Sequence, residues 1–538
     1  MNRNNWRLPV TGLRFLLSVV LVMGIFFRFV NIDRKFYWFD ETFTSLRVSG
    51  YLIKSVKEEI FNGPVVSSKD FLKYQSISDQ KNEIDTIKGL AMEEGQLPPF
   101  YFLVARFWAK LFGTSVTAMR SLPALISLLL FPCAYWLCLE LFESSMVGWV
   151  AMALVSVSPM HVLYAQEARP YCFWTVLTLL SSAVLLRAMR LQTKLLWGIY
   201  TAITVVGIYT HLYTVLVLIA HGIYVFAMEK VRVTKTVISY ILAFFVAFIA
   251  GWLPWYLTLK YWQPPSSSSP LSVMRSASRI PLMPLITRWV GNISRIIFDV
   301  NIDAMSSFKK TLPLIPVIVF VLILLAYSIY FVCRHTSKPV YGFILTLIVF
   351  TSLPLMLGDL ILGGRRLSGY ARYLIPTYLG LQLAVAYLLT AKITSTSVNT
   401  WQQKFWKLVA IGVFSAGVLS CTLSSQAETW WNKGLAQGKY AIPIAQIVNQ
   451  ADSPLLITDS GIGLVIPLSR LLAPKVDILW GDKFQFSQIP NGYRNLFVFA
   501  PTKKLQERLE KQDNYKLNPV FLTSELSYKT QLWQLTHK

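Results

Sequence analysis

Cysteine is scarce in this 538-residue chain and absent from its polar C-terminal region. The five cysteines lie in or beside apolar runs, at positions 133, 138, 172, 333 and 421. This placement excludes a disulfide framework and shows no metal-ligand spacing. Because no His/Cys cluster occurs elsewhere in the sequence, nothing supports a resident metal, and a divalent ion is left as an open alternative.

Acidic residues are also few. Asp and Glu number 27 against 51 Lys and Arg, which gives a formal net charge of +24. Such a charge indicates a nucleic-acid partner only when the basic side chains gather on one soluble face. Here they are spread between apolar segments, so we exclude nucleic acid as a partner. The pattern is typical of the cytoplasmic loops of membrane proteins, where Lys and Arg accumulate.

Long polar stretches are rare as well. Only roughly the last 110 residues lack apolar runs long enough to cross a membrane, and the mean hydropathy of the chain is +0.48. The sequence therefore predicts an α-helical polytopic membrane protein with about eleven transmembrane helices. The expected spans cover approximately residues 14–31, 119–141, 146–164, 171–189, 195–210, 212–228, 236–259, 312–332, 340–362, 373–391 and 405–424.

The distribution of charge predicts the topology. The basic segment Met1–Arg14 precedes an apolar run without a small-residue cleavage site, so we expect a retained first span and a cytoplasmic N-terminus. Eleven spans then place the tail outside. The predicted domains are a transmembrane domain over 1–424, with an extracytoplasmic loop at 32–118, and an extracytoplasmic domain over 425–538. Basic clusters that fall inside stand at 187–194, 230–235, 334–338 and 392–407.

The polar segments have secondary-structure patterns of their own. In the first loop, residues 45–61 and 71–92 are expected to form surface helices, and 98–113 an interfacial helix. A surface helix is also expected at 285–298. In the tail, residues 454–463 and 494–501 are predicted to form buried strands that end in turns, and 503–511 a short helix, which favours a small α/β domain.

The first candidate site is the pair Asp40-Glu41, which follows the first span and four aromatic residues, Phe36-Tyr-Trp-Phe39. Carboxylates this close to hydrocarbon are costly and usually face a cavity or a partner. We therefore interpret the pair as catalytic carboxylates. The alternatives are a solvated Asp-Glu pair in a loop, or an Asp40 that caps the next helix by accepting its free N–H groups.

Two more groups of polar residues are expected on the same face. Glu167 and Arg169 follow the third span, where they bind substrate or simply pair with each other at a helix end. His211 and Tyr213 lie in a very short turn between two spans, where a lone histidine is either a substrate ligand or a locally hydrogen-bonded interface residue.

The last candidate group is Arg365, Arg366 and Arg372, with Tyr373 beside it. These arginines lie on the side where few are expected. The planar guanidinium binds phosphate oxygens with two parallel hydrogen bonds, so the cluster suits a lipid-linked phosphate. The alternative is general attraction to anionic headgroups.

In order and spacing, these motifs resemble those of the bacterial glycosyltransferases related to dolichyl-phosphate-mannose–protein mannosyltransferase, which have the GT-C fold and include the lipid A aminoarabinose transferase. The resemblance covers roughly residues 10–425. The motifs that carry it are Asp40-Glu41, Pro98-Pro99-Phe-Tyr before Leu111-Phe-Gly113, Ala165-Gln-Glu-Ala-Arg169, Tyr209-Thr-His-Leu-Tyr213 and Arg372-Tyr-Leu-Ile-Pro376.

The resemblance implies a glycosyltransferase of the bacterial plasma (inner) membrane, working on the extracytoplasmic face. It implies a polyprenyl-phosphate-linked sugar as donor, a glycan, lipid or protein as acceptor, and Asp40 as general base. One position departs from the family pattern. Members usually carry His or Lys directly before Pro-Pro, whereas this chain has Gln96-Leu97. The Leu97 side chain offers no hydrogen bond to a phosphate or sugar, so either Gln96 or one of the arginines substitutes, or the donor is held differently.

Two other functions are compatible with these motifs. A flippase or transporter of lipid-linked sugars predicts charged, broken helices near the midplane, often in two related halves. The charges here gather at one face and no internal repeat is visible, which favours the enzyme. A catalytically degenerate family member is the third alternative, because of Leu97.

Overall fold

The computed structural model describes residues 11–61, 63–262, 281–300, 308–361, 367–394, 400–430, 433, 437–481, 492–511, 515–522 and 532–537. The chain forms two compact units. Unit 1 comprises residues 1–32, 95–101 and 120–426, and unit 2 comprises 33–94, 102–119 and 427–538. The polar loop after the first span therefore belongs to the same unit as the C-terminal tail.

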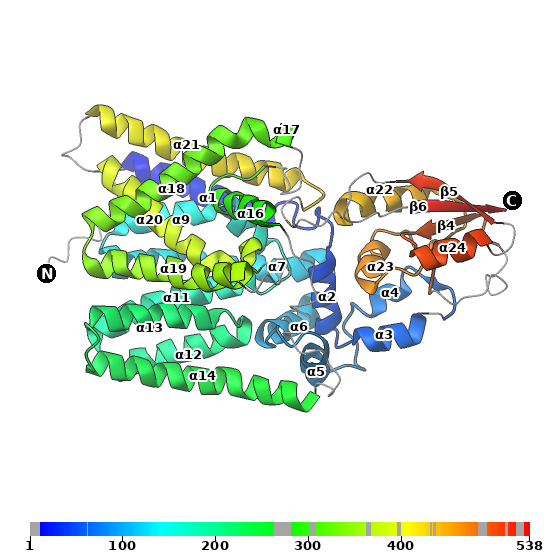
Figure 1. The fold of residues 1–538 in the computed structure, drawn as a ribbon, viewed down its shortest axis with the longest axis horizontal. Coiled ribbons are helices and arrows are strands. Elements are labelled where there is room, and N and C mark those ends of the chain that lie inside the picture. Colours follow the sequence, from blue (N-terminus) through cyan, green and yellow to red (C-terminus); the bar gives the residue numbers. More distant parts are fainter. Residues whose placement is uncertain are drawn as a thin grey trace. The chain divides into compact units, whose positions relative to one another are not determined.

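Unit 1 is helical (Figure 1). Its long helices are α1 (Thr11–Phe29), α8 (Leu130–Phe142), α9 (Ser145–Ser156), α10 (Pro159–Ala165), α11 (Tyr171–Leu191), α12 (Lys194–Thr210), α13 (Thr214–Met228), α14 (Lys235–Trp262), α16 (Leu282–Ser294), α18 (Ile315–His335), α19 (Lys338–Ile361), α20 (Ile375–Thr394) and α21 (Thr400–Gln426). Short helical turns are α17 (Phe308–Thr311), η2 (Leu312–Leu314), η3 (Leu367–Gly369) and η4 (Ala371–Leu374). Helices α6 (Phe100–Phe112) and α7 (Val116–Ser127) contribute residues to both units.

The structure confirms a polytopic membrane protein. In the part of the chain that it describes, seven helices are long and apolar enough to cross a membrane, or eight if the bent pair α9–α10 counts as one span. The three remaining expected spans coincide with shorter apolar helices at 15–29, 194–210 and 214–228. Each of the eleven expected spans thus corresponds to a helix or helix pair.

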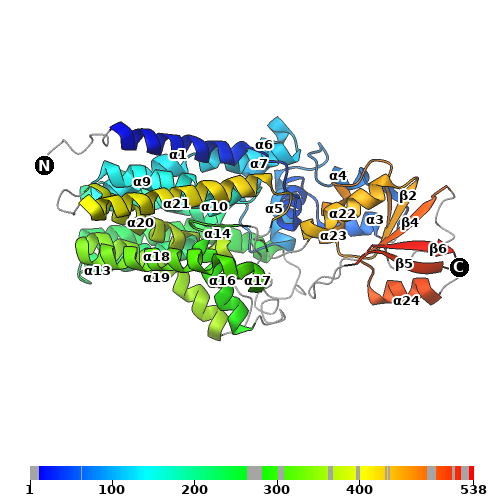
Figure 2. The ribbon, with the colours of Figure 1, turned by 90° about the horizontal axis from the view of Figure 1, so that it is seen from above.

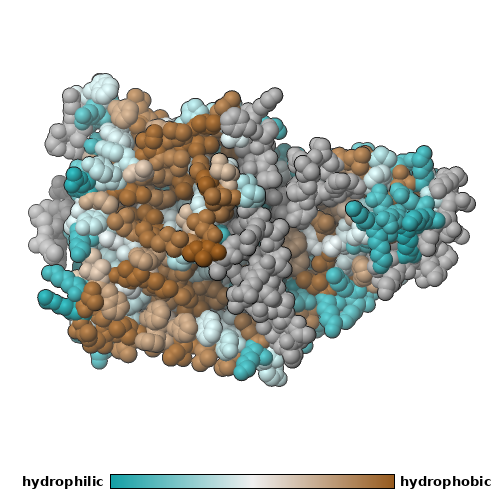
Figure 3. All heavy atoms as spheres, viewed as in Figure 1, coloured by the Kyte–Doolittle hydropathy of each residue, from teal (hydrophilic) through white to brown (hydrophobic). Residues whose placement is uncertain are grey.

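Helix α20 lies at the centre of unit 1. In the span that contains it, 89% of the most apolar window is buried, whereas the span of α18 is only 22% buried. Helices α9, α18, α19 and α21 pack around it, and α1 packs against α9 and α21 (Figure 2). The outer helices present apolar side chains to the surroundings (Figure 3), as expected for contact with lipid hydrocarbon.

The third expected span is broken. Helices α9 and α10 meet at an angle of 62°, because Pro159 begins α10 and cannot continue the α9 hydrogen-bond ladder. The fully buried Arg28 of α1 donates to the freed carbonyls of Ser156 at 2.7 Å and Val155 at 3.2 Å. A cation at a helix C-terminus offsets the partial negative charge of those carbonyls, so Arg28 stabilises the break.

Unit 2 combines helices with one mixed sheet. Its helices are α2 (Phe39–Val48), α3 (Ile53–Ile60), α4 (Asp70–Lys73), α5 (Glu83–Glu93), α22 (Gln437–Gln450), α23 (Ile462–Ser469) and α24 (Lys503–Lys511). Its strands are β1 (Val66–Ser67), β2 (Pro454–Thr458), β3 (Asp477–Trp480), β4 (Asn495–Phe499), β5 (Tyr515–Phe521) and β6 (Leu532–His537), in the order β1-β3-β2-β4-β6-β5. The predicted α/β tail is confirmed, and the loop after the first span adds the edge strand β1, antiparallel to β3.

The loop helices differ from those expected. Instead of one helix over 45–61, the chain forms α2 and α3, which are separated at Gly50. Gly50 has φ +83°, a conformation that glycine adopts without a Cβ clash. Residues 71–92 likewise divide into α4 and α5 with a turn between them. Apolar spacing alone did not reveal these interruptions.

Candidate active site

The pair Asp40-Glu41 lies in the first turn of α2, where carboxylates complement the positive end of the helix. The two side chains have different surroundings. Glu41 is fully buried, and its carboxylate accepts the backbone N–H of Trp38 at 3.4 Å. Asp40 is only half-buried. Trp38, not Asp40, is the N-cap residue, so the expected alternative of Asp40 as the cap does not describe this helix.

The far end of α2 is fixed by a buried arginine. Arg47 is inaccessible to solvent, and its guanidinium contacts Glu93 at 2.6 Å and Glu94 at 2.8 Å. It also donates to the carbonyl of Tyr51 at 2.8 Å. Charged pairs of this kind are geometrically specific. They join α2 to the end of α5, which makes α2 a rigid support for Asp40.

In unit 1, Glu167 and Arg169 lie directly after α10 and are both buried. The preceding Gln166 donates to the carbonyls of Phe27 at 2.9 Å and Val30 at 3.1 Å, at the end of α1. The Gln-Glu-Ala-Arg motif is therefore anchored to the end of the first span through the side-chain amide of Gln166.

An aromatic cluster of Tyr171, Trp174, His211, Tyr213 and Tyr373 lies beside this motif. The His211 ring stacks on Trp174 at 4.2 Å between centroids, with 15° between the planes. It also lies 6.0 Å from both Tyr171 and Tyr373, and Tyr213 meets Tyr373 at 5.2 Å. The structure thus brings together residues from α11, the α12–α13 turn and η4, which are far apart in the sequence.

Arg372 joins the same cluster. Its guanidinium carbon lies 5.2 Å from the ring of Tyr373, 4.9 Å from Tyr370 and 5.8 Å from Tyr171. Arg169 approaches the Tyr171 ring as well, at 6.0 Å. The guanidinium groups of Arg169 and Arg372 therefore both lie near the Tyr171 ring. We call the rings of Tyr171 and Tyr373 the aromatic wall. This arrangement concentrates positive charge where water is partly excluded. Arg365 and Arg366 lie outside the described residues.

The position of Arg372 depends on a carboxylate that the sequence analysis missed. Asp359, buried in α19, accepts the N–H groups of Leu367 at 3.0 Å and Ser368 at 2.8 Å, and the Ser368 hydroxyl at 2.6 Å. Ser368 in turn accepts the Trp289 indole N–H at 2.9 Å. These bonds fix η3, which leads into η4 and Arg372. An Asp at the end of an apolar span was the available signal.

The segment that departs from the family pattern begins with an exposed Gln96 and a half-buried Leu97. Next along the chain, α6 is amphipathic as expected. Phe107, Leu111 and Phe112 are more than half exposed, whereas Arg106 is fully buried and donates to the carbonyls of Val48, at 2.6 Å, and Lys81.

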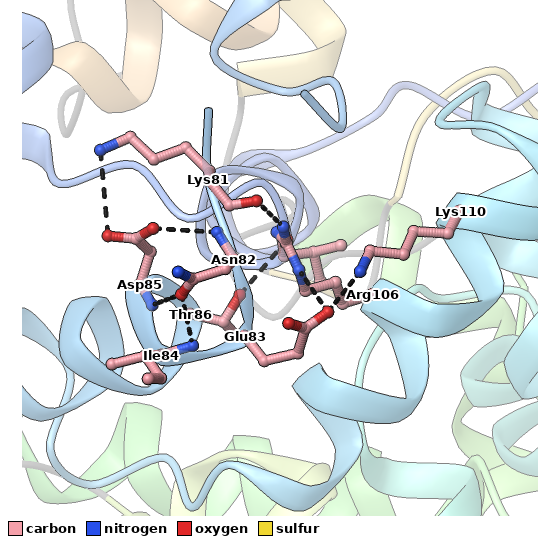
Figure 4. A network of polar contacts seen from close by, with 9 residues as sticks. Lys81, Asn82, Glu83, Ile84, Asp85, Thr86, Arg106 and Lys110 are labelled. Atoms are coloured by element: carbon pink, nitrogen blue, oxygen red, sulfur yellow. Dashed lines mark hydrogen bonds and ion pairs between the residues drawn. The ribbon is translucent and has the colours of Figure 1, made fainter. Parts of the chain in front are cut away.

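Glu83 of α5 joins this network (Figure 4). Its carboxylate accepts a hydrogen bond from the Lys110 ammonium and lies 3.5 Å from Nε of Arg106. The Lys110 ammonium, with help from backbone N–H groups, holds the pKa of Glu83 below its usual value. The charges that interrupt α6 therefore connect it to α2 and α5.

Within the described ranges, no group of three or more His, Cys, Asp or Glu side chains is placed to hold a metal ion.

The match to a family model covers residues 96–255, and the family is dolichyl-phosphate-mannose-protein mannosyltransferase. This confirms over that stretch the resemblance that the motifs indicated. A comparison with curated proteins finds no match.

Among solved structures, the chain is similar to ArnT from Cupriavidus metallidurans bound to undecaprenyl phosphate. The TM-score is 0.51 at 12% sequence identity, and the match covers 98% of each chain. For the apo state of the same protein, the TM-score is 0.51 at 12% sequence identity, over 97% of this chain and 98% of that one. For the oligosaccharyltransferase of Archaeoglobus fulgidus in the apo form, the TM-score is 0.47 at 11% sequence identity, over 87% of this chain and 65% of that one. The chain therefore has the polytopic fold of ArnT.

Proposed function

We propose that this protein is a membrane glycosyltransferase that transfers a sugar from a polyprenyl phosphate to a glycan, lipid or protein acceptor. The observation that carries the proposal is the likeness to ArnT over 98% of both chains, since that protein was solved with undecaprenyl phosphate bound. A polyprenyl donor stays in the bilayer, so its phosphate lies at the lipid–water boundary, where the proposed residues follow membrane helices. The enzyme would work in the bacterial inner membrane, on its extracytoplasmic face.

Asp40 is the general base of the proposed reaction. Its half-buried carboxylate takes the proton of the acceptor hydroxyl as that oxygen attacks the anomeric carbon. The bond between this carbon and the phosphate oxygen breaks in the same step, which inverts the configuration and releases polyprenyl phosphate. Glu41 is too deeply buried for this role and stabilises the first turn of α2. No enzyme nucleophile is needed.

Unit 1 supplies the donor contacts. Arg372, with Arg365 and Arg366 in the same sequence motif, offsets the negative charge that grows on the leaving phosphate. Tyr373, His211 and Tyr213 offer ring faces and polar edges to the sugar. Glu167, Arg169 and Gln96 complete the proposed set, as hydrogen-bond partners of the sugar hydroxyl groups.

The test uses the full-length protein in lipid vesicles with a polyprenyl-phosphate sugar labelled in the sugar. The glycan change in cells that lack the protein, read by mass spectrometry, identifies the sugar and acceptor to use. We expect the label to move to the acceptor and polyprenyl phosphate to be released in equal amount. Movement of the intact lipid-linked sugar between leaflets, without cleavage, would instead identify a transporter. Absence of both processes with the identified substrates would identify a degenerate family member.

A further inference from the structure

The four aromatic residues that precede Asp40, Phe36 to Phe39, are each held by a residue from the C-terminal part of unit 2. We call residues 36–39 the aromatic segment. Both backbone polar groups of Phe36 are hydrogen-bonded. The Phe36 N–H donates to the carbonyl of Glu428 at 2.8 Å, and the Trp430 indole N–H donates to the Phe36 carbonyl at 2.7 Å. The chain is thus fixed at the start of the segment.

The next two rings are covered by cations. The Arg470 guanidinium lies 4.4 Å from the centre of the Tyr37 ring, and Arg470 also donates to Gln75 at 2.6 Å. The Lys433 ammonium lies 4.8 Å from the Trp38 ring. Tyr37 and Trp38 are both only 4% exposed, and cation–ring contacts gain strength when water is excluded.

The last ring packs against a glycine of α23. A Cβ on residue 463 would lie 2.0 Å from Cε2 of Phe39, a separation that no carbon pair tolerates. Gly463 is therefore required for close approach of the helix to the ring. Phe39 is adjacent to Asp40 in the first turn of α2, so a shift of its ring and backbone moves the carboxylate as well.

From these four contacts we propose that the C-terminal part of unit 2, through the described residues named above, positions the Asp40 carboxylate for catalysis. Gly463, Trp430, Lys433 and Arg470 are positioning residues, which act through the aromatic segment and not on the substrate. This inference rests on the proposed role of Asp40. Its physical basis is that a displaced base loses rate steeply, because a misplacement of about 1 Å can cost about 10²-fold.

Gly463→Ala is the decisive variant, and Gly461→Ala is its matched control. A Cβ on residue 461 meets nothing within 4 Å, although both glycines lie at the start of α23. We expect Gly463→Ala to lower kcat about 10- to 100-fold with little change in the KM for the donor. Gly461→Ala should keep wild-type kcat. A second change, Phe39→Leu, removes the ring that the new methyl group meets and should restore part of the lost kcat.

Trp430→Phe provides an independent test if Gly463→Ala does not fold. It keeps an aromatic ring beside Lys433 but removes the N–H that binds the Phe36 carbonyl, so kcat should again fall while donor KM stays. A drop in thermal stability with unchanged kcat in both variants would show a merely structural contact and overturn the inference. So would an equal loss of kcat in Gly461→Ala and Gly463→Ala.

Hydrogen–deuterium exchange over residues 36–48 separates this inference from the proposed function, because it needs no substrate. We expect faster amide exchange in Gly463→Ala than in wild type or Gly461→Ala. Unchanged exchange would contradict the positioning role even in an active enzyme. Conversely, faster exchange in a protein that transfers no sugar would support the contact and reject only the glycosyltransferase assignment.

Discussion

At the N-terminus of α2, two neighbouring carboxylates differ in burial, and this difference separates their roles. Successive helical residues point about 100° apart, so both cannot address one reacting atom. Glu41 is fully buried and accepts the backbone N–H of Trp38, the residue just before its helix. Asp40 keeps access to solvent. The family resemblance already named Asp40 as the general base, and the difference in burial between the two side chains supports the same choice.

We predict that Asp40→Asn lowers kcat by about 10²–10⁴-fold, the usual contribution of a placed general base. Because Asn keeps the shape of Asp, the KM for the donor should change little. Glu41→Gln should lower thermal stability more than turnover. Asp33→Asn is the matched control, since Asp33 is an exposed carboxylate in the same loop. Normal turnover by Asp40→Asn with a dead Glu41→Gln would mean that the roles are exchanged.

A second prediction concerns Arg372, whose guanidinium shares the aromatic wall of Tyr171 and Tyr373. Replacement by Gln removes the charge that is proposed to meet the donor phosphate, so the KM for the polyprenyl donor should rise several-fold. Arg372→Lys should recover only part of the loss, because an ammonium lacks the planar fork. The control variant is Arg288→Gln, on α16 of the same unit, which should leave the donor KM unchanged. Unchanged donor dependence in Arg372→Gln would place the phosphate site elsewhere.

At the scale of elements, Asp359 shows how a span end supports a substrate contact. One carboxylate holds three donors of η3, and η3 precedes the turn that carries Arg372. An amide in its place accepts through one oxygen only, so at least one buried N–H or O–H loses its partner, at about 1–3 kcal/mol.

We therefore predict that Asp359→Asn lowers the free energy of unfolding by about 1–3 kcal/mol and raises the donor KM in the same direction as Arg372→Gln. Thermal unfolding in detergent and steady-state kinetics measure the two effects. The double variant Asp359→Asn/Arg372→Gln should show a donor KM close to that of Arg372→Gln alone. Fully additive effects on KM would mean that Asp359 does not act through Arg372.

Hydropathy located the apolar helices well, because a long apolar stretch is a local property of the sequence. It did not locate what holds the candidate site. The break between α9 and α10 is stabilised by Arg28 from another helix, and the edge strand β1 pairs with β3, about 400 residues later. The packing of Gly463 on Phe39 is equally distant along the chain. Such contacts follow from tertiary structure and leave little trace in a local pattern, apart from the isolated Gly461-Ile-Gly463 pair.

At the scale of the whole molecule, the proposed chemistry requires that Asp40 and Arg372 lie on the same side of the membrane. The sequence places both outside by the parity of the spans and by the basic clusters at 187–194, 230–235, 334–338 and 392–407. Each expected span coincides with a helix or helix pair, including the bent pair α9–α10, and the parity of the spans stays a prediction.

We predict that a reporter fused after Glu229, at the end of α13, is cytoplasmic and that one fused after Lys538 is extracytoplasmic. A fusion at Ser337, between α18 and α19, should report the cytoplasm as well, because it lies in a basic cluster. A phosphatase that is active only outside and a fluorescent protein that folds only inside give opposite signals at each position. The same side for Glu229 and Lys538 would contradict the odd number of spans. If both signals are cytoplasmic, Asp40 lies on the opposite side from the tail, although β1 and β3 join the loop after the first span to that tail in one sheet. Because a sheet cannot extend across the bilayer, that result would contradict the fold of unit 2 together with the proposed active face.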